Sequence, residues 1–148
     1  VSFNVILSSI FANIHDIILS CIGIFIFYTK GVKVKTINNK KQLVYILPFI
    51  IFVAVAKAFW DALYLKLSMD ISFFTYPLPN ILGVVAFIGS ALLIRGFVLG
   101  FLLSAIFELY MAVQYAGFSN SFLVFNMLIH AISFIVFTIG YIKARNIN

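Results

Sequence analysis

The stretch GSALLIRGFVLGFLLS, from Gly89 to Ser104, decides how often this chain crosses a membrane. It places Arg95 in the middle of an apolar run that extends from Leu78 to Tyr115. As one helix, those roughly 38 residues would be about 57 Å long, at about 1.5 Å per residue. The apolar core of a bilayer is only about 30 Å thick. The length of the run therefore predicts two shorter helices that meet at Arg95 and Gly96.

The residue types at this junction favour the same division. Gly96 directly follows Arg95, and glycine readily takes the left-handed conformation that ends many helices. An arginine at a helix end reaches the lipid headgroups, whereas an arginine at the bilayer centre is energetically costly. We therefore expect Arg95 to be a turn residue between two membrane helices.

The composition is that of an integral membrane protein. Of 148 residues, 64% are hydrophobic and only 9% are charged, and the mean hydropathy is +1.18. A soluble domain carries about 25% charged residues. The single cysteine, Cys21, excludes an internal disulfide and a metal site made only of cysteines. The sequence also lacks the GxSxG, HExxH, CxxC, Walker and Rossmann motifs, which disfavours an enzyme that acts on its own.

The hydrophobic segments predict an all-α fold, a single domain that is a bundle of five transmembrane helices. Pro77 and Pro79 separate the second segment from the third, because proline ends one helix and suits the start of the next. The predicted spans cover about residues 5–28, 43–67, 78–94, 97–115 and 121–142.

Basic residues predict the orientation of this bundle. Lysines and arginines cluster in a loop, Lys30 to Lys41, and in a tail, Lys143 to Asn148. Five spans with the N-terminus outside bring the loop, Arg95 and the tail to one side, whereas four spans would place the tail opposite the loop. The positive-inside rule therefore favours five spans, an outside N-terminus and a cytoplasmic C-terminus. We expect a cell membrane, plasma or inner, as the location, and no nucleic acid as a partner. The predicted cytoplasmic residues that face the lipid headgroups are Lys30, Lys33, Lys35, Lys40, Lys41, Arg95, Lys143 and Arg145.

Ionisable residues also fall at the central or outer depth of the predicted spans. Since lipid does not tolerate such groups, they should converge on the bundle interior or on a wet cavity. Helical spacing supports this, because Gly100, Ser104 and Glu108 share one face of their span. The residues predicted to form a translocation site or buried polar site are Asp16, Lys57, Asp61, Glu108 and His130.

Three functions are compatible with these residues. The first is a subunit that moves protons, cations or small solutes, in a homo-oligomer or with other membrane subunits. The second is a redox subunit, in which His15 and His130 ligate a b-type haem, or join Asp16 and Glu108 in a metal site. The third is a structural accessory subunit, whose polar residues bond partner helices. Lys57 and Asp61, four residues apart, are also open to a purely local interpretation as an ion pair.

Overall fold

A computed structural model describes residues 40–117 and 121–147, together with residues 36–37 and the single positions 14, 18 and 22. The predicted first span therefore lies outside the described residues, apart from those three positions. The same holds for His15, Asp16 and the predicted cytoplasmic residues Lys30, Lys33 and Lys35. The claims that rest on them stay predictions.

The described chain contains four long helices and one short 3₁₀ helix. These are α2 (Lys40–Met69), η1 (Phe73–Thr75), α3 (Pro77–Ile94), α4 (Leu99–Ala116) and α5 (Ser121–Ile147). All four long helices are long and apolar enough to cross a membrane. The prediction of an all-α protein that crosses the membrane several times is confirmed for the described part of the chain.

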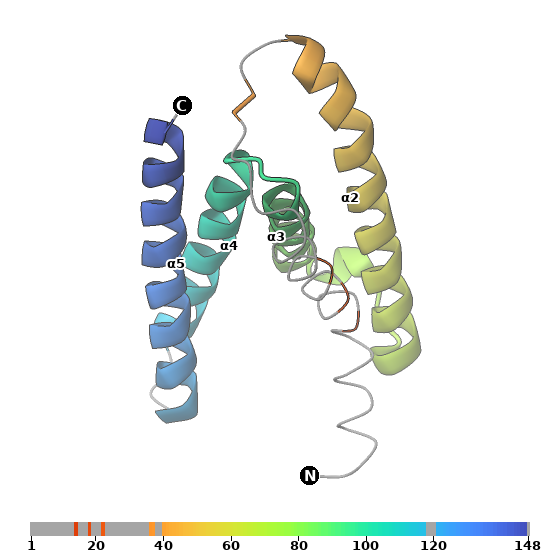
Figure 1. The fold of residues 1–148 in the computed structure, drawn as a ribbon. Helices are drawn as coiled ribbons and strands as arrows, with labels where there is room; N and C mark the ends of the chain where they lie inside the picture. Colours follow the sequence, from red (N-terminus) through yellow and green to blue (C-terminus); the bar gives the residue numbers. More distant parts are fainter. Residues whose placement is uncertain are drawn as a thin grey trace.

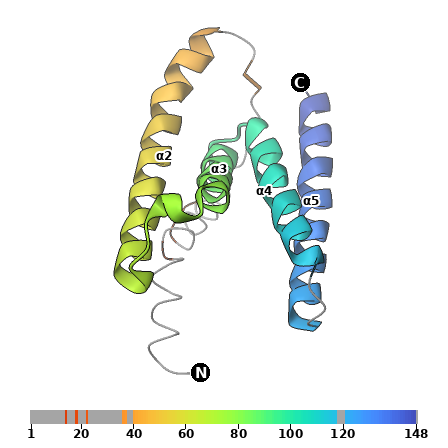
Figure 2. The same ribbon diagram turned by 180° about the vertical axis from the view of Figure 1, so that it is seen from behind.

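The four helices alternate in direction and form a row in chain order. Within the described ranges, α2 packs only on α3 among the long helices, α3 also packs on α4, and α4 also packs on α5. Opposite views place α2 on one flank and α5 on the other (Figure 1, Figure 2). The start of α2, the α3–α4 turn and the end of α5 lie at the same end of the helices, the upper end in Figure 1. The basic residues of these three segments are therefore at one end of the molecule.

The predicted break at Arg95 and Gly96 is confirmed. Helix α3 ends at Ile94, and Gly96 adopts a left-handed φ of 80°. The Gly96 N–H donates to the Leu93 carbonyl at 2.8 Å, and the Phe97 N–H donates to the Leu92 carbonyl at 2.9 Å. These two bonds form a Schellman motif, which satisfies carbonyls that the helix end leaves open.

Small residues set how closely α3, α4 and α5 approach. A Cβ added to Gly89 of α3 would lie 3.1 Å from the Gly100 carbonyl oxygen of α4, so the two backbones are nearly in contact. A Cβ added to Gly140 of α5 would lie 2.7 Å from the Phe101 ring of α4. Membrane helices have no hydrophobic drive to associate within lipid, so close packing of this kind holds them together.

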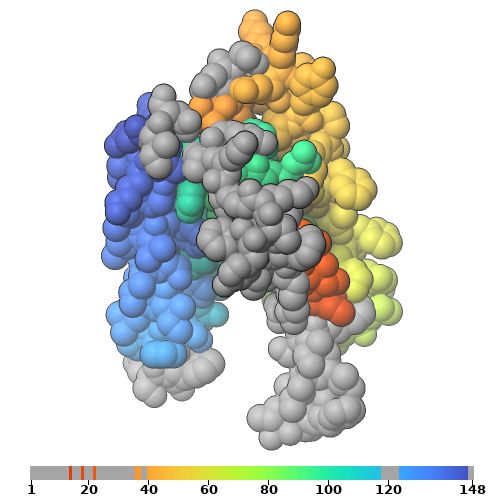
Figure 3. Space-filling view, viewed as in Figure 1, coloured from red at the N-terminus to blue at the C-terminus, as the bar shows by residue number. Residues whose placement is uncertain are grey.

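Large apolar side chains cover the outer faces of the row. Phe52 and Phe59 of α2 are exposed, as are Ile132 and Val136 of α5. The space-filling view shows α2 and α5 as the two flanks of the molecule (Figure 3). In a protein that crosses the membrane several times, such faces contact the lipid bilayer.

The helix ends correct two details of the predicted boundaries. Lys40 and Lys41 belong to the first turn of α2 and not to the loop before it, and Lys143 and Arg145 belong to α5 and not to a tail. Helix α2 has 30 residues, about 45 Å at about 1.5 Å per residue, whereas the apolar core spans about 30 Å. Since lysine and arginine are good helix formers, both helices continue beyond the apolar stretch that marked them in the sequence.

Candidate functional site

A lysine–aspartate pair lies in the C-terminal half of α2. Lys57 Nζ is 2.8 Å from Asp61 Oδ1, and the two side chains are only 11% and 19% exposed. The Lys57 ammonium also lies over the ring of Phe87 in α3, 5.7 Å from its centroid. The ion pair that the spacing suggested is therefore formed, and it sits where α2 meets α3.

A second polar pair joins α4 to α5. His130 Nδ1–H donates to Glu108 Oε2 at 2.5 Å, although the two residues are 22 positions apart in the sequence. The Tyr115 ring stacks on the imidazole, with centroids 5.7 Å apart and planes 9° from parallel. Because Tyr115 and Glu108 both come from α4, this helix holds the His130 ring from two sides.

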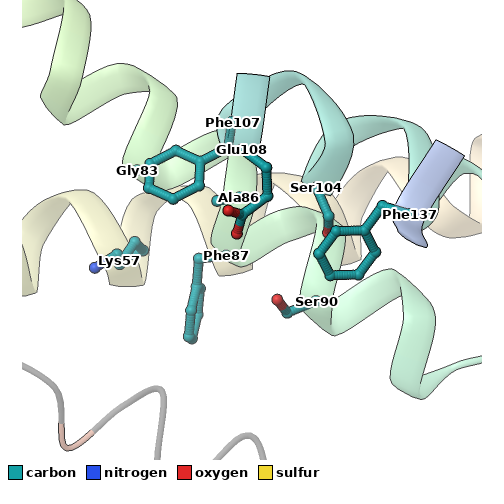
Figure 4. A pocket seen from close by; sticks show the side chains of 9 residues that line it. All are labelled: Lys57, Gly83, Ala86, Phe87, Ser90, Ser104, Phe107, Glu108 and Phe137. Atoms are coloured by element: carbon teal, nitrogen blue, oxygen red, sulfur yellow. The ribbon is translucent and has the colours of Figure 1, made fainter. Parts of the chain in front are cut away.

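A pocket of about 240 Å³ lies between the two pairs. All four long helices contribute to its wall, and the α3 residues follow the spacing of one helical face. The lining residues are Lys57 of α2, Gly83, Ala86, Phe87 and Ser90 of α3, Ser104, Phe107 and Glu108 of α4, and Phe137 of α5 (Figure 4).

Three oxygen-bearing side chains face the interior of this pocket. The Glu108 carboxylate and the hydroxyls of Ser90 and Ser104 point toward a shared central space, whereas the Lys57 amine points away from it (Figure 4). Ser104 is only 4% exposed, and its Oγ has no hydrogen-bond partner among the residues that the structure describes. The pocket therefore contains a buried hydroxyl with hydrogen-bonding capacity to spare.

The pocket lies near the middle of α4 along the length of that helix. Glu108 is the tenth of the 18 residues of α4, a helix of about 27 Å, close to the thickness of the apolar core. At that depth a charged group is costly unless it is paired or wet. Lys57 has Asp61 as a counter-charge, while Glu108 has a histidine that is charged only when protonated.

The structure brings together four of the five residues predicted for the polar site. Lys57 and Glu108 line the pocket, and Asp61 and His130 are each bonded to one of them. The fifth, Asp16, lies outside the described residues.

Sequence reasoning missed the contribution of α3 and of the phenylalanines. The signal was present in α3, where Gly83, Ala86, Phe87 and Ser90 recur at helical spacing as small, polar and aromatic residues on one face. Phe107 and Phe137 carry no such signal, because eighteen phenylalanines occur in this chain and most are indistinguishable by pattern.

The haem and metal interpretations both depend on His15, which lies outside the described residues, so they stay predictions. Within the described ranges, the structure contains no group of three His, Cys, Asp or Glu side chains that is placed to hold a metal ion.

Comparison with known proteins yields no relative. No protein-family model, curated protein or solved structure matches this chain.

Proposed function

We propose that this chain is a transport subunit, in which protons or another small cation or solute cross the bilayer through the pocket between the four described helices. The observation that carries this proposal is the Glu108–His130 hydrogen bond at the pocket wall, near the middle of α4. Histidine is the ordinary side chain whose charge changes near neutral pH. A carboxylate that is hydrogen-bonded to a histidine can bind a cation or a proton and release it, while both side chains stay in place.

The neighbouring Lys57–Asp61 pair supports the same function. Its two charges cancel at a separation of 2.8 Å, so it lines the route with polar groups and adds no net charge. Intramembrane ionisable residues that face a bundle interior are characteristic of ion and proton pathways. Few helices are present for a complete alternating-access machine, so we further propose that the chain works as a homo-oligomer or with other membrane subunits.

In the proposed orientation, the helix ends that carry the basic residues face the cytoplasm. The protein lies in the plasma or inner membrane. Lys40 and Lys41 begin α2, Arg95 caps α3, and Lys143 and Arg145 lie near the end of α5. Anionic headgroups and the positive-inside rule favour the cytoplasmic leaflet for such a cluster. Combined with the predicted first span, this gives five spans and an outside N-terminus.

Proteoliposomes test the transport function. Vesicles that contain the purified protein and a trapped pH dye receive an acid pulse, with sodium, potassium or tetramethylammonium as the only external cation. We expect the pH gradient to dissipate faster than in protein-free vesicles in at least one of these media. Glu108→Gln should abolish the difference, because it keeps the size of the side chain and removes its charge. Asp70→Asn, which removes an exposed carboxylate outside the pocket, is the matched control. Equal rates with and without protein in every medium would contradict the proposal.

Single cysteines test the orientation. In a Cys21→Ala background, Lys41→Cys and Asp70→Cys introduce thiols at opposite ends of α2. A membrane-impermeant maleimide added to intact cells should label the Asp70→Cys variant, and should label Lys41→Cys only after permeabilisation. The reverse pattern would invert the proposed topology.

A further inference from the structure

We propose that the pocket binds a small quaternary ammonium ion that carries a hydroxyl group, a ligand of the 2-hydroxyethyl-trimethylammonium type, and that this ion competes with a proton for the Glu108–His130 pair. The transport of such an ion rests on the proposed function, whereas its binding is measured independently of transport.

The balance of charge around the pocket calls for a cation. The two polar pairs together contain one lysine and two carboxylates, so their net charge is −1 while His130 is neutral. A net negative charge near mid-membrane is unfavourable, and either a bound cation or a proton on His130 brings the sum to zero. The cation and the proton therefore compete for one site.

Among the residues that the structure describes, few other groups near His130 can take part in this competition. Helix α4 presents Glu108 and the Tyr115 ring to the imidazole. Helix α2 places Lys57 at the pocket wall, with Asp61 bound to it, and α3 lines the pocket with no ionisable side chain. Within the described part of the chain, Glu108 and His130 are therefore the groups whose charge the cation has to match.

The lining chemistry favours an organic cation over a metal ion. Hard metal ions such as Ca²⁺ take about six to eight oxygen ligands, whereas the lining offers one carboxylate and two hydroxyls. It offers instead the rings of Phe87, Phe107 and Phe137, and Phe87 and Phe137 lie on opposite sides of the central space (Figure 4). Aromatic faces attract ammonium groups. The Lys57 ammonium over the Phe87 ring is an example of this contact within the protein itself.

The scarcity of acceptors further favours a quaternary ammonium. A primary ammonium brings three N–H donors that need acceptors. One oxygen of Glu108 already accepts from His130, so a primary ammonium would need the other Glu108 oxygen and both serine hydroxyls as acceptors at once. A methylated ammonium needs no hydrogen bonds, and its methyl groups contact the phenylalanines. A volume of about 240 Å³ is below the usual range of drug-sized pockets, about 300–1,000 Å³, which restricts the ligand to a few carbon atoms.

The Ser104 hydroxyl indicates that the ligand also carries a polar group. It is buried, directed into the pocket and without a hydrogen-bond partner among the described residues. Ser104 lies four positions before Glu108 on α4, and residues at this spacing are about 5–6 Å apart. A hydroxyl two carbon atoms from the ammonium nitrogen is suited to this separation, with the ammonium at Glu108 and the hydroxyl at Ser104.

Calorimetric titration of the detergent-purified protein with choline, tetramethylammonium, sodium and potassium salts tests this proposal. We expect saturable choline binding, weaker tetramethylammonium binding, and no displacement of choline by equal concentrations of sodium or potassium. Glu108→Gln should weaken choline binding about tenfold or more, as expected for a lost charged contact. Ser104→Ala should lower the choline affinity to that of tetramethylammonium, because only choline has the hydroxyl. Asp70→Asn, far from the pocket wall, should bind choline as the unmodified protein does.

The competition with protons has its own readout. Choline binding should weaken as the pH falls, because a proton on the Glu108–His130 pair takes the place of the bound cation. His130→Gln, which cannot take up that proton, should remove this pH dependence. Size-exclusion profiles of the variants show whether each remains folded. Ser104→Ala tests the ligand contact without changing the charge of Glu108 or His130.

Three results would overturn the ligand assignment: no saturable choline binding, equal displacement by sodium or potassium, or unchanged choline binding in Glu108→Gln. The proteoliposome assay separates this failure from failure of the proposed function. A pH gradient that dissipates in sodium or potassium medium, with no choline binding, retains transport and rejects the ligand. Choline binding with no dissipation in any medium retains the ligand and rejects transport.

Discussion

Helix α2 carries two lysine–aspartate pairs that are identical in sequence pattern and opposite in surroundings. Lys57–Asp61 and Lys66–Asp70 have the same order and the same spacing of four residues, and both form ion pairs. The first pair is 11% and 19% exposed, whereas the second is 69% and 82% exposed. The second also sits where the helix ends, since Asp70 follows Met69 and has a φ of 53°.

The same charge pattern therefore has different energetic consequences in different surroundings. If the exposed pair separates, both charges are solvated, so exposed pairs contribute little to stability. If the pair beside the pocket loses one partner, the other charge remains largely shielded from solvent. Variants of both pairs and of Glu108 test how far this contrast extends.

The largest expected effect is that of Lys57→Leu, which leaves the Asp61 charge without its partner. We expect a loss of about 3–5 kcal/mol in the free energy of unfolding, the usual cost of breaking a buried pair from one side. Denaturant titration in detergent, followed by circular dichroism, measures this. A loss as small as that of an exposed pair would remove the contrast between the two pairs.

A smaller effect is expected for Glu108→Leu, which removes the acceptor of the His130 N–H. The variant should lose about 1–3 kcal/mol, the cost of a buried polar group left unsatisfied. The effect is below that of Lys57→Leu because a neutral histidine loses a hydrogen bond and not a counter-charge. The same titration decides the order, and a greater loss for Glu108→Leu than for Lys57→Leu would show that His130 is charged in the folded protein.

The double variant Lys57→Leu, Asp61→Leu should restore most of the stability lost in Lys57→Leu. Replacement of a buried ion pair by apolar residues is often neutral, so we expect a change within about 1 kcal/mol of the unmodified protein. Because the pair is neutral as a unit, the proteoliposome signal should persist. A folded double variant without that signal would instead identify Asp61 or Lys57 as a coupling residue.

The smallest effect is expected for Lys66→Ala, at the exposed pair. Its unfolding free energy should change by less than about 0.5 kcal/mol, because Asp70 remains solvated without its partner. Added salt should not measurably change the unfolding free energy of this variant. A change comparable to that of Lys57→Leu would mean that Asp70 is covered, by lipid or by a partner, in the working protein.

Local features of this protein were predictable from sequence. The break at Arg95 and Gly96 followed from the length of the apolar run and the conformational freedom of glycine, and Gly96 has the expected left-handed φ. The Lys57–Asp61 pair followed from helical spacing. Helix ends were less accurate, because hydropathy reports where lipid begins, while backbone hydrogen bonds and helix propensity decide where the helix stops.

The class of the protein and the apolar segments that contain its polar residues were predictable from the sequence, because hydropathy, proline and glycine act on the chain locally. Packing between helices decides that Glu108 bonds to His130, and that Ser90, Ser104 and Phe137 share a pocket with Lys57. Those contacts join residues of different helices, and their formation depends on how closely small residues such as Gly89, Gly100 and Gly140 let the helices approach. Helix rotation and spacing are set by packing between helices, which no periodicity within one helix contains.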